Sequence, residues 1–243
     1  MDAGFSPPAA DPADAAALAI ARARVTERIA RACDAVHRDP AEVTLVAVSK
    51  TVSAARLRAA VAGGLNLFGE NRVQEAEAKA ADVTGSHWTL IGPLQSNKAR
   101  RAVELFESIQ TVHSIGLARR LEAAAAELLP RPLPVLVQVN VDADPGKSGF
   151  APAALDDAIP VLLELRHLEI GGLMTVGRLV DSAEAARPTF RSLRLLAERL
   201  RAARPGLGAA LSMGMTDDFE VAVEEGATIV RVGRALFGER PQA

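Results

Sequence analysis

The sequence lacks tyrosine altogether, and its other aromatic side chains are 7 Phe and 1 Trp in 243 residues. A mechanism that needs a tyrosine acid, base or nucleophile is therefore excluded. Cysteine occurs once, as Cys33, which excludes a disulfide framework and a cysteine-rich zinc site. Lysine is nearly as scarce, so covalent chemistry through an amine must use Lys50, Lys79, Lys98 or Lys147.

A strong net charge and long apolar runs are absent too. The formal net charge of -2 argues against a nucleic-acid protein that relies on a basic surface. No uninterrupted apolar run reaches the roughly 18 to 20 residues that a membrane span needs. Residues 1–8 lack the basic and apolar regions of a secretory signal. We therefore expect a cytoplasmic protein with neither a nucleic acid nor a membrane as partner.

Short apolar runs alternate eight times with segments of helical pattern, after a helix predicted over residues 12–36. Strands that alternate with helices indicate parallel pairing, and eight such units in about 250 residues match an α/β fold, the (β/α)8 TIM barrel. An open doubly wound sheet is the alternative, because the second strand is short and polar at its end. Residues 1–11 are rich in Pro, Ala and Asp and are expected to be flexible, and residues 12–243 to form one barrel domain. The predicted strands cover 44–49, 66–69, 88–91, 108–112, 134–141, 168–176, 210–213 and 228–232, and the predicted helices 53–62, 72–81, 96–104, 115–128, 152–165, 182–203, 217–225 and a short turn from 234.

Lys50 ends the first predicted strand, in phase with Val46 and Val48. If those side chains point into the barrel, Lys50 points into its mouth, where the active sites of such barrels lie. Burial there lowers the pKa of an amine, and a neutral amine on a rigid strand suits Schiff-base formation. The alternative is a lysine whose stem lies along the strand end with its ammonium in water. The residues alone leave both interpretations open.

The other three lysines carry weaker signals. Lys79 follows Glu75 by four residues on a predicted helix, which indicates a solvated surface pair. Lys98 starts a helix and Lys147 lies in a Gly/Pro loop. Each of these two either binds an anion or is simply solvated.

A phosphate site is the second candidate, because the loops after strands seven and eight of such barrels often bind phosphate. Here they supply Ser212, Gly214 and Gly233. Gly233 lets a backbone N–H approach an oxyanion, and the Ser212 hydroxyl can donate a hydrogen bond. Arg234 either adds charge or faces solvent. The alternative is that these glycines only close tight turns. A reactive Lys50 opposite this site would hold a phosphorylated aldehyde at both ends.

Several motifs, in this order and spacing, resemble the pyridoxal phosphate homeostasis protein family over about residues 40–240. They are LVAVSKT (45–51), FGENRVQEA (68–76), WTLIGPLQSNKAR (88–100), KSGF (147–150), GGLMTVG (171–177) and the stretch 211–240, which begins LSMGMTDDFE. The resemblance implies a fold-type III barrel of the alanine-racemase type that carries pyridoxal 5'-phosphate (PLP) as a Schiff base on Lys50. It further implies a phosphate site at Ser212 and Gly233 with the backbone of Met213 and Arg234, Arg231 at the pyridine nitrogen, and a pocket lined by Val48, Asn71 and Met174.

Two positions depart from the family pattern. The family usually reads Trp-His-Phe-Ile-Gly at strand three, whereas Thr89 follows the Trp here and His87 precedes it. The family often has Ser or Thr after the strand-eight Gly, where this chain has Arg234. One hydroxyl contact to phosphate would then be missing or replaced by the guanidinium.

The implied cofactor and the available residues together predict weak catalysis. PLP acts as an electron sink, and a carboxylate at its pyridine nitrogen strengthens that sink. Arg231 can only donate hydrogen bonds there, which favours the unprotonated, weaker sink. The racemases of this fold use a second acid/base, a Tyr from a separate domain, and this chain has no Tyr.

We therefore expect a PLP carrier in vitamin B6 homeostasis, with no catalytic residue assigned and no metal, since no metal-ligand spacing is present. The alternatives are a weak PLP-dependent amino-acid racemase with Lys50 as base, and a Schiff-base aldolase on the same fold. Besides PLP, amino acids and apo-PLP enzymes are candidate partners, and a monomer is expected.

Overall fold

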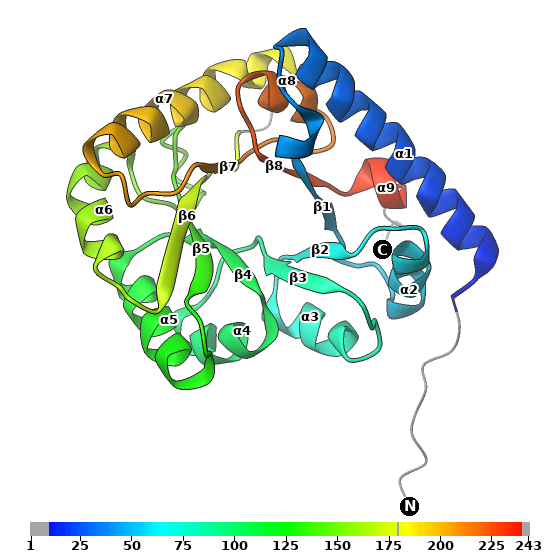
Figure 1. Cartoon of the computed structure of the whole chain (residues 1–243), viewed down its shortest axis with the longest axis horizontal. Coiled ribbons are helices and arrows are strands. Elements are labelled where there is room, and N and C mark those ends of the chain that lie inside the picture. The colour runs from blue at the N-terminus through cyan, green and yellow to red at the C-terminus, as the bar shows by residue number, and fades with distance from the viewer. Residues whose placement is uncertain (1–9, 179, 240–243) are drawn as a thin grey trace, which may run out of the picture.

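The computed structural model describes residues 10–178 and 180–239. Eight parallel strands close into a barrel in which each strand pairs with the next along the chain and the eighth pairs with the first. Helices surround this barrel on the outside (Figure 1). The predicted TIM barrel is confirmed, and the open doubly wound sheet is wrong. The strands are β1 (Thr44–Val48), β2 (Leu67–Glu70), β3 (His87–Leu90), β4 (Ser108–Val112), β5 (Leu133–Gln138), β6 (Leu168–Met174), β7 (Ala210–Ser212) and β8 (Ile229–Val232).

Helices fill the connections between the strands, and most begin close to the predicted residues. The helices predicted over 96–104, 152–165 and 182–203 each begin with a 3₁₀ turn before the α-helical part. None of the helices in the described ranges is long and apolar enough to cross a membrane. The α-helices are α1 (Pro12–Ala35), α2 (Ala54–Ala62), α3 (Val73–Ala80), α4 (Ala99–Leu105), α5 (Ile115–Leu128), α6 (Leu155–Leu163), α7 (Arg187–Ala203), α8 (Phe219–Glu224) and α9 (Arg234–Phe237), and the 3₁₀ turns are η1 (Pro40–Glu42), η2 (Ser96–Lys98), η3 (Pro152–Ala154) and η4 (Glu184–Ala186).

The N-terminal helix α1 lies outside the ring and packs against α2, α8 and α9 (Figure 1). Asp11 caps it, because its carboxylate accepts a backbone N–H of the first turn at 3.1 Å. Arg28 fastens it to α8 through two hydrogen bonds of 2.6 and 2.8 Å to Glu220. The prediction of a flexible segment over 1–11 falls largely on residues 1–9, which lie outside the described residues.

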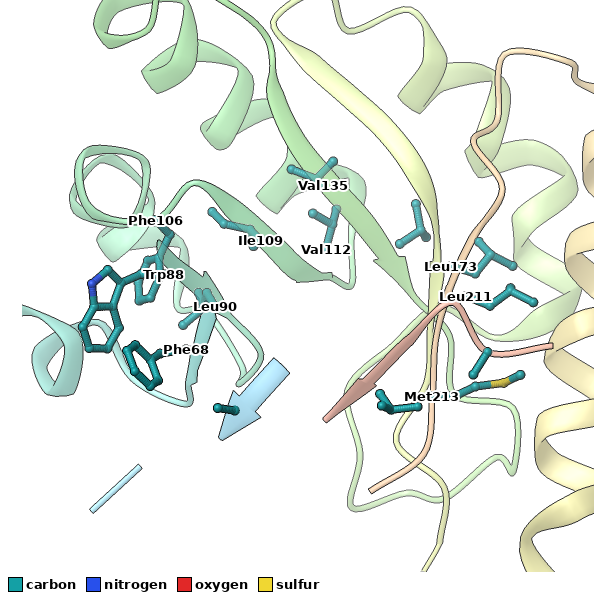
Figure 2. Packing of buried hydrophobic residues seen from close by; sticks show 14 of the residues in the cluster. Phe68, Trp88, Leu90, Phe106, Ile109, Val112, Val135, Leu173, Leu211 and Met213 are labelled. Atoms are coloured by element: carbon teal, nitrogen blue, oxygen red, sulfur yellow. The ribbon is translucent and has the colours of Figure 1, made fainter. Parts of the chain in front are cut away.

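Alternate residues of each strand face the helices and form the hydrophobic core. On β2 and β3, the rings of Phe68 and Trp88 pack with centroids 5.4 Å apart and planes tilted by 43° (Figure 2). Leu211 and Met213, at and just after β7, belong to the same outer layer. Ser212 between them must therefore face the barrel interior.

The inner faces of β1 and β2 pack tightly around a glycine. A Cβ on Gly69 would lie 2.7 Å from Val46 Cγ1 and 2.9 Å from Ile91 Cδ1, so a larger residue there would force these side chains to move. Because side chains alternate along a strand, Val48 follows Val46 on the inner face. In the same alternation, Lys50 is the next inward-facing position, at the mouth of the barrel.

Candidate functional site

A cavity of about 310 Å³ opens beside the carboxyl end of β1. Val48 and Lys50 line it from β1 and the turn that follows, and Gly233 and Arg234 line it from the end of β8. The side chain of Lys50 is partly buried. Four of the predicted site residues therefore meet at one cavity. Its other lining residues are Thr51, Val52, Ser53, Arg56, Phe237, Gly238 and Glu239.

Gly233 leaves its side of the cavity open. A Cβ there would sit 3.5 Å from the Cβ of Val48, an ordinary contact that would occupy space beside the lysine. The Gly233 N–H donates to the Thr216 hydroxyl at 3.3 Å. Sequence reasoning missed Thr216, although a hydroxyl residue in the loop after strand seven was a usable signal. The Thr216 hydroxyl accepts this bond and can still donate its own hydrogen to an oxyanion.

The guanidinium of Arg234 forms ion pairs with Asp217 and with Glu239, the latter at 3.8 Å. Its side chain is half-exposed. The sequence left two options for this residue, charge toward an anion or exposure to solvent. The structure places the charge against two surface carboxylates, while the residue still lines the cavity.

A chain of hydrogen bonds crosses the barrel interior from β3 to β8. Gln110 donates to the Thr89 hydroxyl at 3.3 Å, and the Ser212 hydroxyl donates to Gln110 Oε1 at 2.6 Å. Arg231 Nη1 donates to Ser212 Oγ at 2.6 Å, and Nη2 donates to the Thr175 carbonyl at 2.8 Å. All five side chains are buried. Ser212 does not line the lysine cavity, and its hydroxyl is engaged on both sides.

Arg231 carries a charge into this interior. Its side chain is 4% exposed, and burial lowers the pKa of its guanidinium to about 10, against the opposing effect of Asp218. It thus remains a cation at neutral pH. Two of the five N–H groups of its guanidinium are used by the bonds described above, so donors remain for a ligand acceptor. Asp218 accepts the Met215 N–H at 2.6 Å, and burial raises the pKa of this carboxyl.

The predicted lining residues Asn71 and Met174 and the predicted phosphate-binding backbone of Met213 lie in different places. Asn71 lines a neighbouring groove of about 1550 Å³, which shares Thr51, Val52 and Ser53 with the lysine cavity. Met174 ends β6 and is fully buried. Met213 is also fully buried, and its N–H donates to the Ile229 carbonyl at 3.1 Å. The Met213 amide is therefore used in β7–β8 pairing rather than directed at the cavity.

The prediction of a solvated Lys79 paired with Glu75 is wrong. Lys79 Nζ lies 2.8 Å from Glu70 Oε1 and 3.0 Å from the Ser49 carbonyl oxygen, and its side chain is only 12% exposed. Glu70 is fully buried at the end of β2, so its carboxylate needs a cation beside it. Helical spacing alone identified Glu75 and could not detect a partner on the preceding strand.

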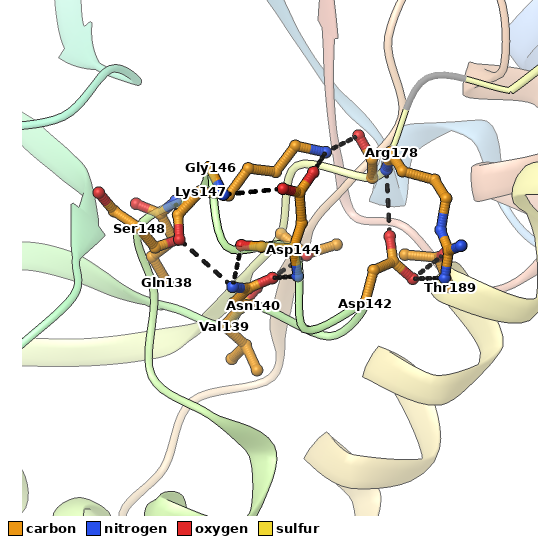
Figure 3. A network of polar contacts seen from close by, with 12 residues as sticks. Gln138, Val139, Asn140, Asp142, Asp144, Gly146, Lys147, Ser148, Arg178 and Thr189 are labelled. Carbon is orange, nitrogen blue, oxygen red and sulfur yellow. Dashed lines mark hydrogen bonds and ion pairs between the residues drawn. The ribbon is translucent and has the colours of Figure 1, made fainter.

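Lys147 has a local structural role in the loop after β5. Its Nζ donates to the Gly177 carbonyl at 2.7 Å and lies 3.4 Å from Asp144 Oδ2. Asn140 supports the same loop, because its Nδ2 donates to the Asp144 carbonyl at 2.8 Å (Figure 3). The lysine thus ties this loop to the one after β6. Lys98, the other loop lysine, lines the large groove.

The two side chains around Trp88 have distinct positions. Thr89, where the family pattern has His, belongs to the interior hydrogen-bond chain. His87 begins β3, at the opposite end of the barrel from the lysine cavity, and contacts Glu107 at 2.8 Å. It therefore does not replace the missing histidine at the site. Within the described ranges, no three His, Cys, Asp or Glu residues cluster as metal ligands would.

The family profile described as alanine racemase, N-terminal domain, matches residues 20–241. A pyridoxal phosphate homeostasis protein of Pseudomonas aeruginosa is 44% identical over 220 residues, which cover 90% of this chain and 94% of that protein. This chain belongs to the pyridoxal phosphate homeostasis protein family. The family resemblance found in the sequence motifs is thereby confirmed.

Solved structures agree with this family membership. PipY of Synechococcus elongatus PCC7942, described with PLP bound, is 43% identical and superposes with a TM-score of 0.77 over 88% of this chain and 100% of that one. Alanine racemase of Clostridium difficile 630 has a TM-score of 0.67 at 15% identity, over 83% of this chain and 53% of that one. The second likeness concerns the fold alone, and it confirms the fold-type III barrel.

Proposed function

We propose that this protein binds PLP as a Schiff base on Lys50 and serves vitamin B6 homeostasis as a carrier with little or no catalysis. The observation that carries the proposal is the position of Lys50, partly buried in a cavity whose opposite side is left open by Gly233. The names of its relatives and the PLP bound to PipY support it. The cavity offers an amine for an aldehyde and backbone N–H groups for a phosphate.

The chain's own residues fit the two ends of such a ligand. Lys50 would condense with the aldehyde, forming one C=N bond and releasing one water. The Arg234 N–H and the Thr216 hydroxyl would bind the phosphate, and the Gly233 N–H would join them by turning from the Thr216 hydroxyl to the ligand. Ser212 would contribute indirectly, because its hydroxyl holds Arg231 rather than facing the cavity.

The ring of the ligand would contact residues from several strand ends. Val48 lines the cavity with Lys50 and Gly233, and we propose that Asn71 and Met174 approach the ring from their strand ends. Met213 would act indirectly, because its N–H donates to the Ile229 carbonyl and so fixes β7 against β8. Arg231 would donate one of its remaining N–H groups to the pyridine nitrogen.

Weak catalysis follows from the same residues. When bound, PLP supplies an electron sink, and that sink is strongest when its pyridine nitrogen is protonated. The only strong polar group proposed at that atom is the cationic Arg231, which can donate but not accept. The 243 residues contain no Tyr to act as a second acid/base. A racemase role would leave Lys50 as sole base. Apo-PLP enzymes and amino acids as partners, a monomeric state and a cytoplasmic location stay predictions.

The test is direct, because the chain has four lysines. Purified protein incubated with PLP should show an imine absorbance band, and borohydride reduction followed by peptide mass spectrometry should place the adduct on Lys50. Lys50→Ala should abolish the band, whereas Lys98→Ala, at the neighbouring groove, should keep it. An adduct on another lysine would contradict the proposal. Rapid racemisation of alanine or serine, lost in Lys50→Ala, would replace the carrier with an enzyme.

A further inference from the structure

The residue after the cofactor lysine has an unfavourable backbone conformation. Thr51 has φ of +67°, in the left-handed region that β-branched residues rarely adopt. Such a conformation persists only when the surrounding structure holds it, and it tends to occur at functional sites. Thr51 directly follows Lys50, so the backbone conformation of Thr51 affects the direction in which the Lys50 side chain points toward the cavity.

The contacts that hold this turn converge on Ser49. The Ser49 carbonyl accepts the Val52 N–H at 3.0 Å, which closes the turn around Lys50 and Thr51. The same carbonyl accepts a hydrogen bond from Lys79 Nζ at 3.0 Å. The Ser49 hydroxyl donates to Glu70 Oε1 at 2.7 Å. Backbone and side chain of Ser49 are thus both fixed from outside the turn.

The ion pair of Lys79 and Glu70 anchors this arrangement. Their charged atoms are 2.8 Å apart, and Glu70 is fully buried. Glu75 is a second carboxyl close to Glu70, and burial together with this neighbour raises the pKa of Glu70 to about 6, against the opposing effect of Lys79. One carboxylate oxygen of Glu70 and one of Glu75 have no hydrogen-bond partner in the described part of the chain. Lys79 is therefore the cation that compensates the buried carboxylate of Glu70.

We propose that Lys79 and Glu70 are positioning residues for Lys50. By binding both the carbonyl and the hydroxyl of Ser49, they keep Thr51 in its left-handed conformation and so aim the Lys50 amine into the cavity. This inference rests on the proposed role of Lys50. A buried ion pair that only stabilised the barrel would have no special link to the conformation of Thr51.

The experiment uses a glycine to separate these roles, because glycine adopts positive φ without strain. Lys79→Met should slow imine formation with PLP about tenfold, since strain of this kind shifts conformer populations by roughly that factor. Adding Thr51→Gly to Lys79→Met should restore most of the rate. Glu77→Gln is the matched control. Glu77 is on the same helix as Lys79, but it pairs with Arg101 of α4, so its replacement should leave the turn intact. If Lys79→Met does not fold, Glu70→Gln/Lys79→Met removes both buried charges and takes its place.

A second measurement needs no cofactor. In the cofactor-free protein, hydrogen exchange in the peptide that covers residues 49–53 should become faster in Lys79→Met and stay unchanged in Glu77→Gln. Failure of Thr51→Gly to restore the rate, or unchanged exchange in Lys79→Met, would overturn the positioning role. Absence of an imine on Lys50 in the unmodified protein would instead refute the proposed function, while the exchange measurement would still decide whether the ion pair holds the turn.

Discussion

Arg231 donates from Nη1 to the hydroxyl of Ser212 at 2.6 Å, and both residues are buried inside the barrel. The Ser212 hydroxyl in turn donates a hydrogen bond of 2.6 Å to Gln110 Oε1. Ser212 therefore connects a buried cation to a buried amide. A phosphate contact, which the sequence predicted for Ser212, would require this hydroxyl to leave one of its two partners.

Replacement of Ser212 by Ala should lower the free energy of unfolding by about 1–3 kcal/mol, because Gln110 Oε1 loses its donor and Arg231 loses an acceptor in the interior. Cofactor release should also become faster, since Arg231 is no longer held. Chemical denaturation and dilution-induced loss of the imine band measure the two effects. Ser148→Ala on the exposed loop is the control and should change neither. Unchanged stability in Ser212→Ala would argue against the hydrogen-bond chain.

Replacement of Lys50 by Ala should remove the imine and leave the fold intact. Lys50 lies at the rim of a cavity rather than in the core, so the free energy of unfolding of the cofactor-free protein should change by less than about 1 kcal/mol. Thermal unfolding followed by circular dichroism checks this. A fall in melting temperature as large as that of Ser212→Ala would show that Lys50 has a structural role as well.

Thr216→Val should weaken the binding of PLP and leave the binding of pyridoxal, which has no phosphate, unchanged. A hydrogen bond to a charged group contributes about 1.5–3 kcal/mol, which corresponds to a loss of affinity of roughly 10- to 100-fold. Titration of both vitamers, followed by imine absorbance, measures the difference. Thr26→Val on α1 is a matched control far from the cavity. Equal losses for both vitamers would place Thr216 at the ring or the lysine instead of the phosphate.

The buried carboxyl of Glu70 should make stability depend on pH. Its pKa is raised from 4.5 to about 6 in the folded protein, so between these values the folded state binds more protons than the unfolded state. Stability contributed by this group is therefore present below pH 4.5 and is lost as the pH rises through 6, by about 2 kcal/mol. Denaturant unfolding at several pH values, compared with Glu70→Gln, isolates this contribution. A difference between the two proteins that stays constant with pH would contradict the assignment.

The barrel was predictable because its signals are local. Each strand is a short apolar run bounded by polar or glycine-rich ends, and the limits of β4 and α5 agree with the predicted 108–112 and 115–128. The strand predicted over 134–141 ends earlier, at Gln138, and the backbone that follows bonds to the returning loop, where the Asn140 N–H donates to the Phe150 carbonyl at 2.9 Å. That bond joins residues across a loop, and no pattern along the strand contains it.

The site residues also divide into those that have a local sequence signal and those whose role depends on tertiary contacts. Lys50 and Gly233 could be identified from strand phase and from a glycine at a strand end, and the structure brings both to one cavity. Lys79 was misread because its partner, Glu70, is on another element and is linked to it only by tertiary packing. Gln110 also escaped notice, since a polar residue in a strand that also contains Ser108 and Thr111 shows its role only when the opposite strand is known.

The hydrogen-bond chain from Thr89 to Arg231 has a consequence for how the protein folds. Its members come from β3, β4, β7 and β8, so no half of the barrel can satisfy them alone. The C-terminal strands supply both acceptors of Arg231, but a partly assembled sheet without β4 would leave the Ser212 hydroxyl and Gln110 without each other, which is costly once they are buried. Closure of the ring and desolvation of these side chains must therefore occur together, so the interior that would present Arg231 to a ligand also makes barrel assembly cooperative.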